Sequence, residues 1–146
     1  MFRQLTLAAA LTGGPALAES LLPYQDAARV ENGAVLYQDH CAACHGAKLE
    51  GEPNWKAPDA DGYMPAPPHD ETGHTWHHAD PLLIQITALG TEAIIGGTYK
   101  SRMSGFADVL TMDEVLDVLA YIKSTWPDEV IAIHNDINAR AAAFRN

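Results

Sequence analysis

The sequence is poor in three features, and each scarcity excludes a class of protein. Only two of its 146 residues are cysteines, which excludes a disulfide-dense scaffold. Nine Lys and Arg stand against 19 Asp and Glu, and this net charge of −10 argues against binding to nucleic acid or to an anionic membrane surface. Beyond the N-terminus, no apolar run approaches the length that spans a bilayer. A chain of this length with 47% hydrophobic residues instead predicts a single domain with a sizeable core.

The first eighteen residues have the layout of a secretory signal peptide. A short basic start is followed by a mostly apolar stretch over residues 5–11, then by the helix breaker Gly13-Gly14-Pro15 and the cleavage triplet Ala16-Leu17-Ala18. This segment is too short and too interrupted to span a bilayer. We therefore expect residues 19–146 to be exported as a soluble product, the alternative being an uncleaved N-terminal anchor.

Helical spacing dominates the rest of the chain, in which neither strand alternation nor an internal repeat is present. A series of prolines predicts a long loop over residues 46–79. Asp80-Pro81 is typical of a helix start, with Asp80 as the cap, and Gly90 of a helix end. The segment Thr111-Met112-Asp113-Glu114 is typical of a capping box. We expect an all-α fold with helices over residues 26–38, 80–89, 111–126 and from 127 onward.

The chemistry is indicated by Cys41-Ala42-Ala43-Cys44-His45. In a C-x-x-C-H motif two thiols add across the vinyl groups of haem, and the adjoining imidazole reaches the iron. A thioredoxin-like redox pair would need a βαβ context, and a zinc site would need a second pair of ligands. A plain disulfide would not explain His45. The motif therefore predicts one covalently attached haem c, with Cys41 and Cys44 as thioethers and His45 as an iron ligand.

Over residues 26–127 the chain resembles the class I c-type cytochromes. Gly33-Ala34-Val35-Leu36-Tyr37 is similar to the N-terminal helix of that family, where a glycine admits an aromatic residue of the C-terminal helix, here Tyr121. The resemblance implies crossing N- and C-terminal helices and a long loop that wraps the haem. Residues 128–146 would form an extra C-terminal helix.

The resemblance also implies roles for loop residues. Pro53-Asn54-Trp55 is similar to a family stretch whose proline carbonyl accepts the ring N–H of the proximal histidine. Pro53 would thus fix the tautomer of His45, with Pro58 as second candidate, and Trp55 would bind the cofactor. The expected haem-lining residues are Trp55, Tyr63, Tyr99, Phe106 and Ile122.

Arg102-Met103-Ser104-Gly105-Phe106 resembles the distal methionine loop of the family, with Ser104 where proline is usual. The resemblance implies Met103 as the second iron ligand, and Met64 is the alternative. Histidine and methionine together favour ferrous iron and leave no site open for oxygen or substrate. The implied function is a soluble periplasmic electron carrier, not an enzyme, which exchanges electrons with a donor and with a terminal oxidase or reductase.

Two further features leave alternatives open. Residues 69–78 hold His69, His74, His77 and His78, which would suit a copper or zinc site, a pH-sensitive docking surface, or a loop folded over the haem edge. We expect no tight metal site there, because no ligand spacing matches a known signature. A redox subunit or enzyme with a site in this loop and a haem-based sensor remain alternative functions. Lys100 and Arg102 would steer a redox partner or would simply be solvated loop charges.

Overall fold

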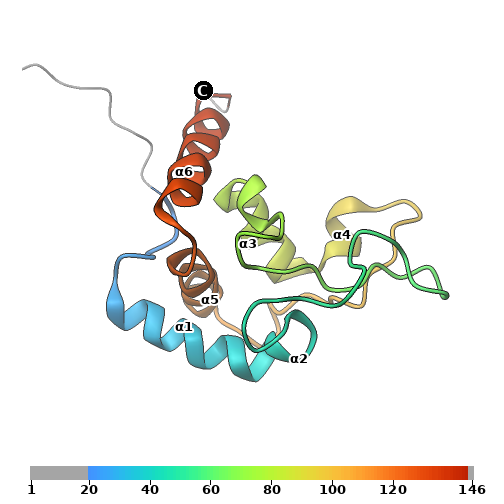
Figure 1. Cartoon of the computed structure of the whole chain (residues 1–146). Coiled ribbons are helices and arrows are strands. Elements are labelled where there is room, and N and C mark those ends of the chain that lie inside the picture. Colours follow the sequence, from blue (N-terminus) through green and yellow to red (C-terminus); the bar gives the residue numbers. More distant parts are fainter. Residues whose placement is uncertain (1–19, 145–146) are drawn as a thin grey trace, which may run out of the picture.

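The computed structural model describes residues 20–144, so the predicted signal peptide lies outside the described residues. Within residues 20–144 there is no strand, only isolated bridges between Met64 and Ser101 and between Gly90 and Ser104. This confirms the predicted all-α fold (Figure 1). The elements are α1 (Ala27–His40), α2 (Ala42–His45), a 3-10 turn η1 (Thr75–His77), α3 (Asp80–Leu89), α4 (Thr91–Ile95), α5 (Met112–Ser124) and α6 (Asp128–Ala143).

Helices α1 and α5 lie against each other, as Figure 1 shows. Their close approach is at Gly33. A Cβ atom added to Gly33 would collide with the backbone carbonyl oxygen of Asp117 and would lie 3.0 Å from the Cβ of Tyr121. The absence of a side chain therefore sets the distance between the two helices. Gly33 and Tyr121 meet as the resemblance implied.

The helix ends follow local signals with one exception. Asp26 caps α1 by accepting from two backbone N–H groups, and Thr111 and Glu114 form the predicted capping box of α5. Gly90, with φ of +87°, ends α3, but the short helix α4 that follows was not expected. Asp80 was expected to cap α3 and does not. It is the first helical residue, and the cap position is Ala79.

The side chain of Asp80 belongs instead to a buried polar cluster beside the middle of α6. Its Oδ2 accepts from the hydroxyl of Ser20 at 2.8 Å and from the backbone N–H of Leu21 at 2.7 Å. The ammonium of Lys123, which is fully buried, donates to the Ser20 hydroxyl at 2.9 Å. His134 Nε2 lies 3.4 Å from Asp80 Oδ1. This cluster joins the N-terminal segment, α3, α5 and α6.

An apolar core lies beside this cluster and draws on α1, α3, α5 and α6. Its buried members are Leu22, Tyr37, Leu49, Leu83, Leu110, Val115, Val118, Leu119, Ile122, Trp126 and Val130. Helix α6 packs against η1, where His134 Nε2 donates to the carbonyl of His78 at 2.9 Å. Helix α6 thereby binds the C-terminal end of residues 69–78, the segment that carries four histidines. None of the helices in residues 20–144 has the length and apolar character needed to cross a membrane.

The crossing at Gly33 gives a stability prediction in which two effects have opposite signs. Alanine has the higher helix propensity, so Gly33→Ala would stabilise an isolated helix by about 0.5–1 kcal/mol. The collision with the Asp117 carbonyl forces α1 and α5 apart, and overpacking of this kind costs about 1–3 kcal/mol. We expect a net loss in the free energy of unfolding, measured by chemical denaturation. Equal or higher stability of Gly33→Ala would contradict the close crossing.

Candidate functional site

The C-x-x-C-H motif forms a single helical turn directly after α1. Cys41 is the cap residue of α2, and the backbone N–H of His45 donates to the carbonyl of Cys41 at 2.9 Å. Cys41 is half-buried and Cys44 is exposed, and both are free thiols. Burial, with a smaller effect of Cys44, raises the pKa of the Cys41 thiol to about 11. The turn thus brings two thiols and an imidazole together at the end of α1.

His45 is buried, with 7% of its surface exposed, and its ring is held by a loop carbonyl. Its Nδ1 lies 2.8 Å from the carbonyl oxygen of Pro67, which can only accept, so this nitrogen carries the proton. The expected acceptors, Pro53 and Pro58, are therefore wrong. With Nδ1 protonated, Nε2 is the nitrogen that can ligate a metal, and the carbonyl makes it more basic. Burial lowers the pKa of His45, which favours the neutral ligating form.

Backbone hydrogen bonds explain why Pro67 takes this place. The N–H of Glu52 donates to the carbonyl of Ala66 and the N–H of His69 donates to that of Leu49, each at 2.8 Å. These bonds lay residues 66–69 against the segment that follows α2. Pro53 lies in an exposed turn outside this pairing.

His69 is a close neighbour of His45 that sequence reasoning did not assign. The two rings stack with centroids 4.0 Å apart and planes inclined by 24°. His69 Nδ1 lies 2.7 Å from the Thr75 hydroxyl, and the indole of Trp126 donates to the His69 carbonyl at 2.7 Å. Burial, together with His45 and His74, lowers the pKa of His69 well below its usual value. No signal in the sequence points to this contact, because it follows from the pairing that places Pro67 at His45.

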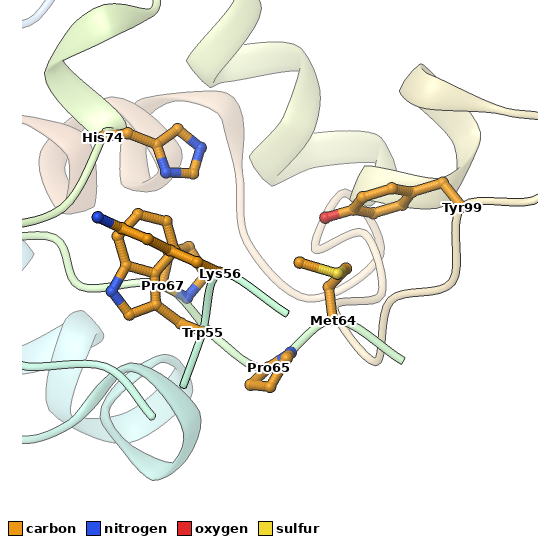
Figure 2. Close-up of a pocket in the computed structure, with 7 residues that line it drawn as sticks. All are labelled: Trp55, Lys56, Met64, Pro65, Pro67, His74 and Tyr99. Carbon is orange, nitrogen blue, oxygen red and sulfur yellow. The ribbon is translucent and has the colours of Figure 1, made fainter. Parts of the chain in front are cut away.

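Beside Pro67 lies a cavity of about 370 Å³, drawn in Figure 2. Trp55 and Tyr99, two of the five expected haem-lining residues, line this cavity. Ile122 belongs to the buried core, Phe106 lies against the ring of His40, and Tyr63 lies under Arg102. The complete lining is Trp55, Lys56, Met64, Pro65, Pro67, His74 and Tyr99.

The two candidate methionines lie on neighbouring segments. Met64 lines the cavity, and its N–H donates to the carbonyl of Lys100 at 2.9 Å. Met103 is half-buried, and its sulfur accepts from the hydroxyl of Thr91 at 3.4 Å. The N–H of Met103 donates to the Ser101 hydroxyl at 3.1 Å. Two thioethers therefore lie on adjacent segments, that of Met64 at the cavity and that of Met103 at the Thr91 hydroxyl.

Lys100 and Arg102 bind within the chain. Lys100 donates to the backbone carbonyl of Asp61 at 3.1 Å, and Arg102 pairs with the carboxylate of Asp59 at 2.6 Å. The guanidinium also lies 4.2 Å from the centroid of the Tyr63 ring. These contacts tie the Met103 segment to residues 59–63. They give the two cations a structural role besides any steering of a partner.

The four histidines of residues 69–78 pack on different aromatic rings, and His74 and His78 contact each other edge to face. His69 stacks on His45, His74 stacks on Trp55, and His77 stacks on Trp76. In the part of the chain that the structure describes, no group of three His, Cys, Asp or Glu side chains is placed to hold a metal ion. The expectation of no tight copper or zinc site stays a prediction, and calorimetric titration of the holoprotein checks it.

The arrangement fits haem on three observations. Two free thiols and a buried imidazole with its Nδ1 already bonded share one turn. An aromatic and apolar cavity adjoins the proline that holds this imidazole. A buried nitrogen of His74, which lines the cavity, has no hydrogen-bond partner in the described residues.

Comparison with known protein families agrees with a haem site formed by two thiols and an imidazole. A search of curated proteins returned no match, and neither did a search of solved structures. The sequence model of the family described as Cytochrome c matches residues 30–126, from within α1 to just beyond α5. The match therefore includes the C-x-x-C-H turn, the long loop and the Met103 segment. The chain belongs to the cytochrome c family, whose members bind haem and transfer electrons.

Proposed function

We propose that the protein carries one haem c, bound covalently through Cys41 and Cys44, and acts as a soluble electron carrier in the periplasm. His45 and Met103 are the proposed iron ligands. The observation that carries the proposal is the buried ring of His45, oriented by the Pro67 carbonyl and placed one turn after two free thiols. Bound haem would supply an iron that cycles between the ferric and ferrous states.

The residues of the chain would do three things for this carrier. Cys41 and Cys44 would hold the haem edge, and Pro67 would keep the His45 ring in one tautomer and orientation. Trp55 and Tyr99 line opposite sides of the cavity and would exclude water from the cofactor there. A sixth ligand from Met103 would close the iron to oxygen and favour the ferrous state.

The test uses protein secreted by a bacterial host that can attach haem c. Its mass and its optical spectrum are measured. Mass spectrometry after acid–organic extraction is expected to find the chain from Glu19 plus one haem, because thioethers survive denaturation. Cys41→Ser and Cys44→Ser should each lose one of the two bonds, and the double variant should release all haem. Complete loss of haem from the unaltered protein would refute covalent attachment.

The same preparation separates the carrier from an enzyme or a sensor. A low-spin, six-coordinate spectrum with a methionine–iron band supports the carrier, since no position remains for a substrate or a gas. A high-spin spectrum would support an enzyme or a sensor instead. N-terminal sequencing of the secreted protein tests export, and an N-terminus other than Glu19 would contradict the predicted cleavage site.

A further inference from the structure

The ring of His45 is held along two perpendicular directions. In the plane of the ring, Nδ1 donates to the Pro67 carbonyl at 2.8 Å. Across its face lies the ring of His69, with centroids 4.0 Å apart and planes inclined by 24°. A carbonyl oxygen accepts over a broad range of directions, so the hydrogen bond alone lets the His45 ring turn about the line between the two atoms. The stack opposes this turn, because a turned ring would collide with His69.

His69 is itself fixed at its backbone and at its ring. Its backbone N–H donates to the carbonyl of Leu49 at 2.8 Å, and its own carbonyl accepts from the indole of Trp126 at 2.7 Å. Its ring Nδ1 lies 2.7 Å from the hydroxyl of Thr75, a residue that is buried. The buried ring of Tyr37 lies edge-on to it, with centroids 6.3 Å apart. His69 therefore presents a fixed, flat surface to its neighbour.

The C-terminal end of the chain takes part in holding His69. The Trp126 ring packs edge-on against His134 of α6, with centroids 5.1 Å apart and planes at 84°. His134 Nε2 in turn donates to the carbonyl of His78 at 2.9 Å. The two ends of residues 69–78 are thus each bound by a ring N–H, one after α5 and one in α6. Helix α6 lies beyond the residues that the family model matches, so this part of the support lies outside the match.

The direction of the His45 ring matters because its Nε2 is the nitrogen that can ligate a metal. Outer partners fix the orientation of a ligating histidine, and they do so best when packing and hydrogen bonds lock their own positions. His69 meets that condition. The plane of an axial imidazole sets which iron orbital it overlaps. A ring that keeps its plane therefore gives the iron one electronic state rather than a spread of them.

We propose that His69 is a positioning residue for the iron ligand His45, whose imidazole plane it fixes by stacking. Pro67 sets the tautomer of the ligand, and His69 sets the direction of its plane. This inference rests on the proposed function, because it takes His45 as the ligand of a haem iron. The role depends on the flat face of the His69 ring, and no gain or loss of a proton by His69 enters it.

The test is proton NMR spectroscopy of the ferric holoprotein, in which the spread of the haem methyl resonances reports the direction of the axial imidazole plane. His69→Ala removes the stacked ring, and we expect it to change the spacing and order of these resonances. His69→Phe keeps a flat ring, and we expect it to return the resonances toward those of the unaltered protein. The matched control is His77→Ala, since His77 belongs to the same segment but is exposed and stacks on Trp76. Its resonances should stay unchanged.

The outcomes separate this inference from the proposed function. Unchanged resonances in His69→Ala with haem still attached would overturn the positioning role alone. So would an equal change in His77→Ala or in His69→Phe, because the flat ring would then not be the cause. Absence of haem from the unaltered protein would overturn both proposals. If His69→Ala does not fold, His69→Leu carries the test, since leucine fills the space without a flat face, and unchanged resonances in that variant refute the role.

Discussion

Replacing Met103 by alanine is expected to leave the haem iron without its sixth ligand. The spectrum should become high-spin, carbon monoxide should bind, and the reduction potential should fall, because the thioether favours ferrous iron. Axial ligands set haem potentials over roughly 0.8 V, and we expect a fall on the order of 0.1 V. Optical spectroscopy and protein-film voltammetry measure these changes.

Backbone contacts hold the segment that carries Met103. Its segment is fixed to the end of α3, where Phe106 and Ala107 donate to the carbonyls of Thr87 and Ala88 at 3.0 and 3.1 Å. Gly90 allows the close approach, since a Cβ there would lie 3.0 Å from the Met103 carbonyl oxygen. A thioether on a segment held in this way would keep its position as the iron changes charge.

Met64→Ala is the matched control, because Met64 offers the same thioether from the neighbouring segment. This variant should enlarge the cavity and leave the low-spin spectrum nearly unchanged. High-spin iron in Met64→Ala together with an unchanged Met103→Ala would reverse the assignment. Met64 would then be the ligand, and Met103 would remain a packing residue bonded to Thr91.

The sequence predicts those parts of the structure that depend on neighbours in the chain. The C-x-x-C-H turn and the capping box at Thr111 each lie within a single helical turn. The contact of Gly33 with α5 joins distant residues, and the family resemblance implied it. Pro67 could not be found this way. Several prolines follow His45, and the choice among them depends on the pairing of residues 49–52 with residues 66–69. A loop pairing of this kind leaves no periodic signal.

Asp80 shows the same limit at a helix start. Its position before Pro81 is typical of a cap, and the boundary of α3 is correct to one residue. Its carboxylate instead accepts from Ser20 and Leu21, about sixty residues earlier in the chain. The structure shows that the Asp80 carboxylate is a buried hydrogen-bond acceptor near the buried Lys123, and these contacts depend on the folded chain.

Asp80→Ala is expected to be strongly destabilising. The carboxylate is 1% exposed, and its removal leaves the Leu21 N–H without its acceptor and the Lys123 cation without a nearby negative charge. A buried hydrogen-bond donor left without its acceptor costs about 1–3 kcal/mol, and the loss of the charge near Lys123 adds to this. Chemical denaturation of the holoprotein near pH 7 measures the loss. The control is Asp136→Ala in α6, whose exposed pair with Arg140 should contribute no more than about 0.5 kcal/mol.

The pH dependence of the difference in the free energy of unfolding between Asp80→Ala and the unaltered protein separates the effect of charge from that of hydrogen bonds. Burial lowers the pKa of Lys123 to about 8, below the 10.5 of an exposed lysine, while Asp80 acts in the opposite direction. Between these values the unfolded chain binds more protons than the folded protein, so this residue makes the free energy of unfolding rise with pH. Above about pH 8 the folded protein holds Lys123 neutral, and a neutral amine no longer needs the carboxylate. The difference between Asp80→Ala and the unaltered protein should therefore shrink from pH 7 to pH 10. A difference that stays constant over this range would show that Asp80 stabilises the fold through hydrogen bonds alone.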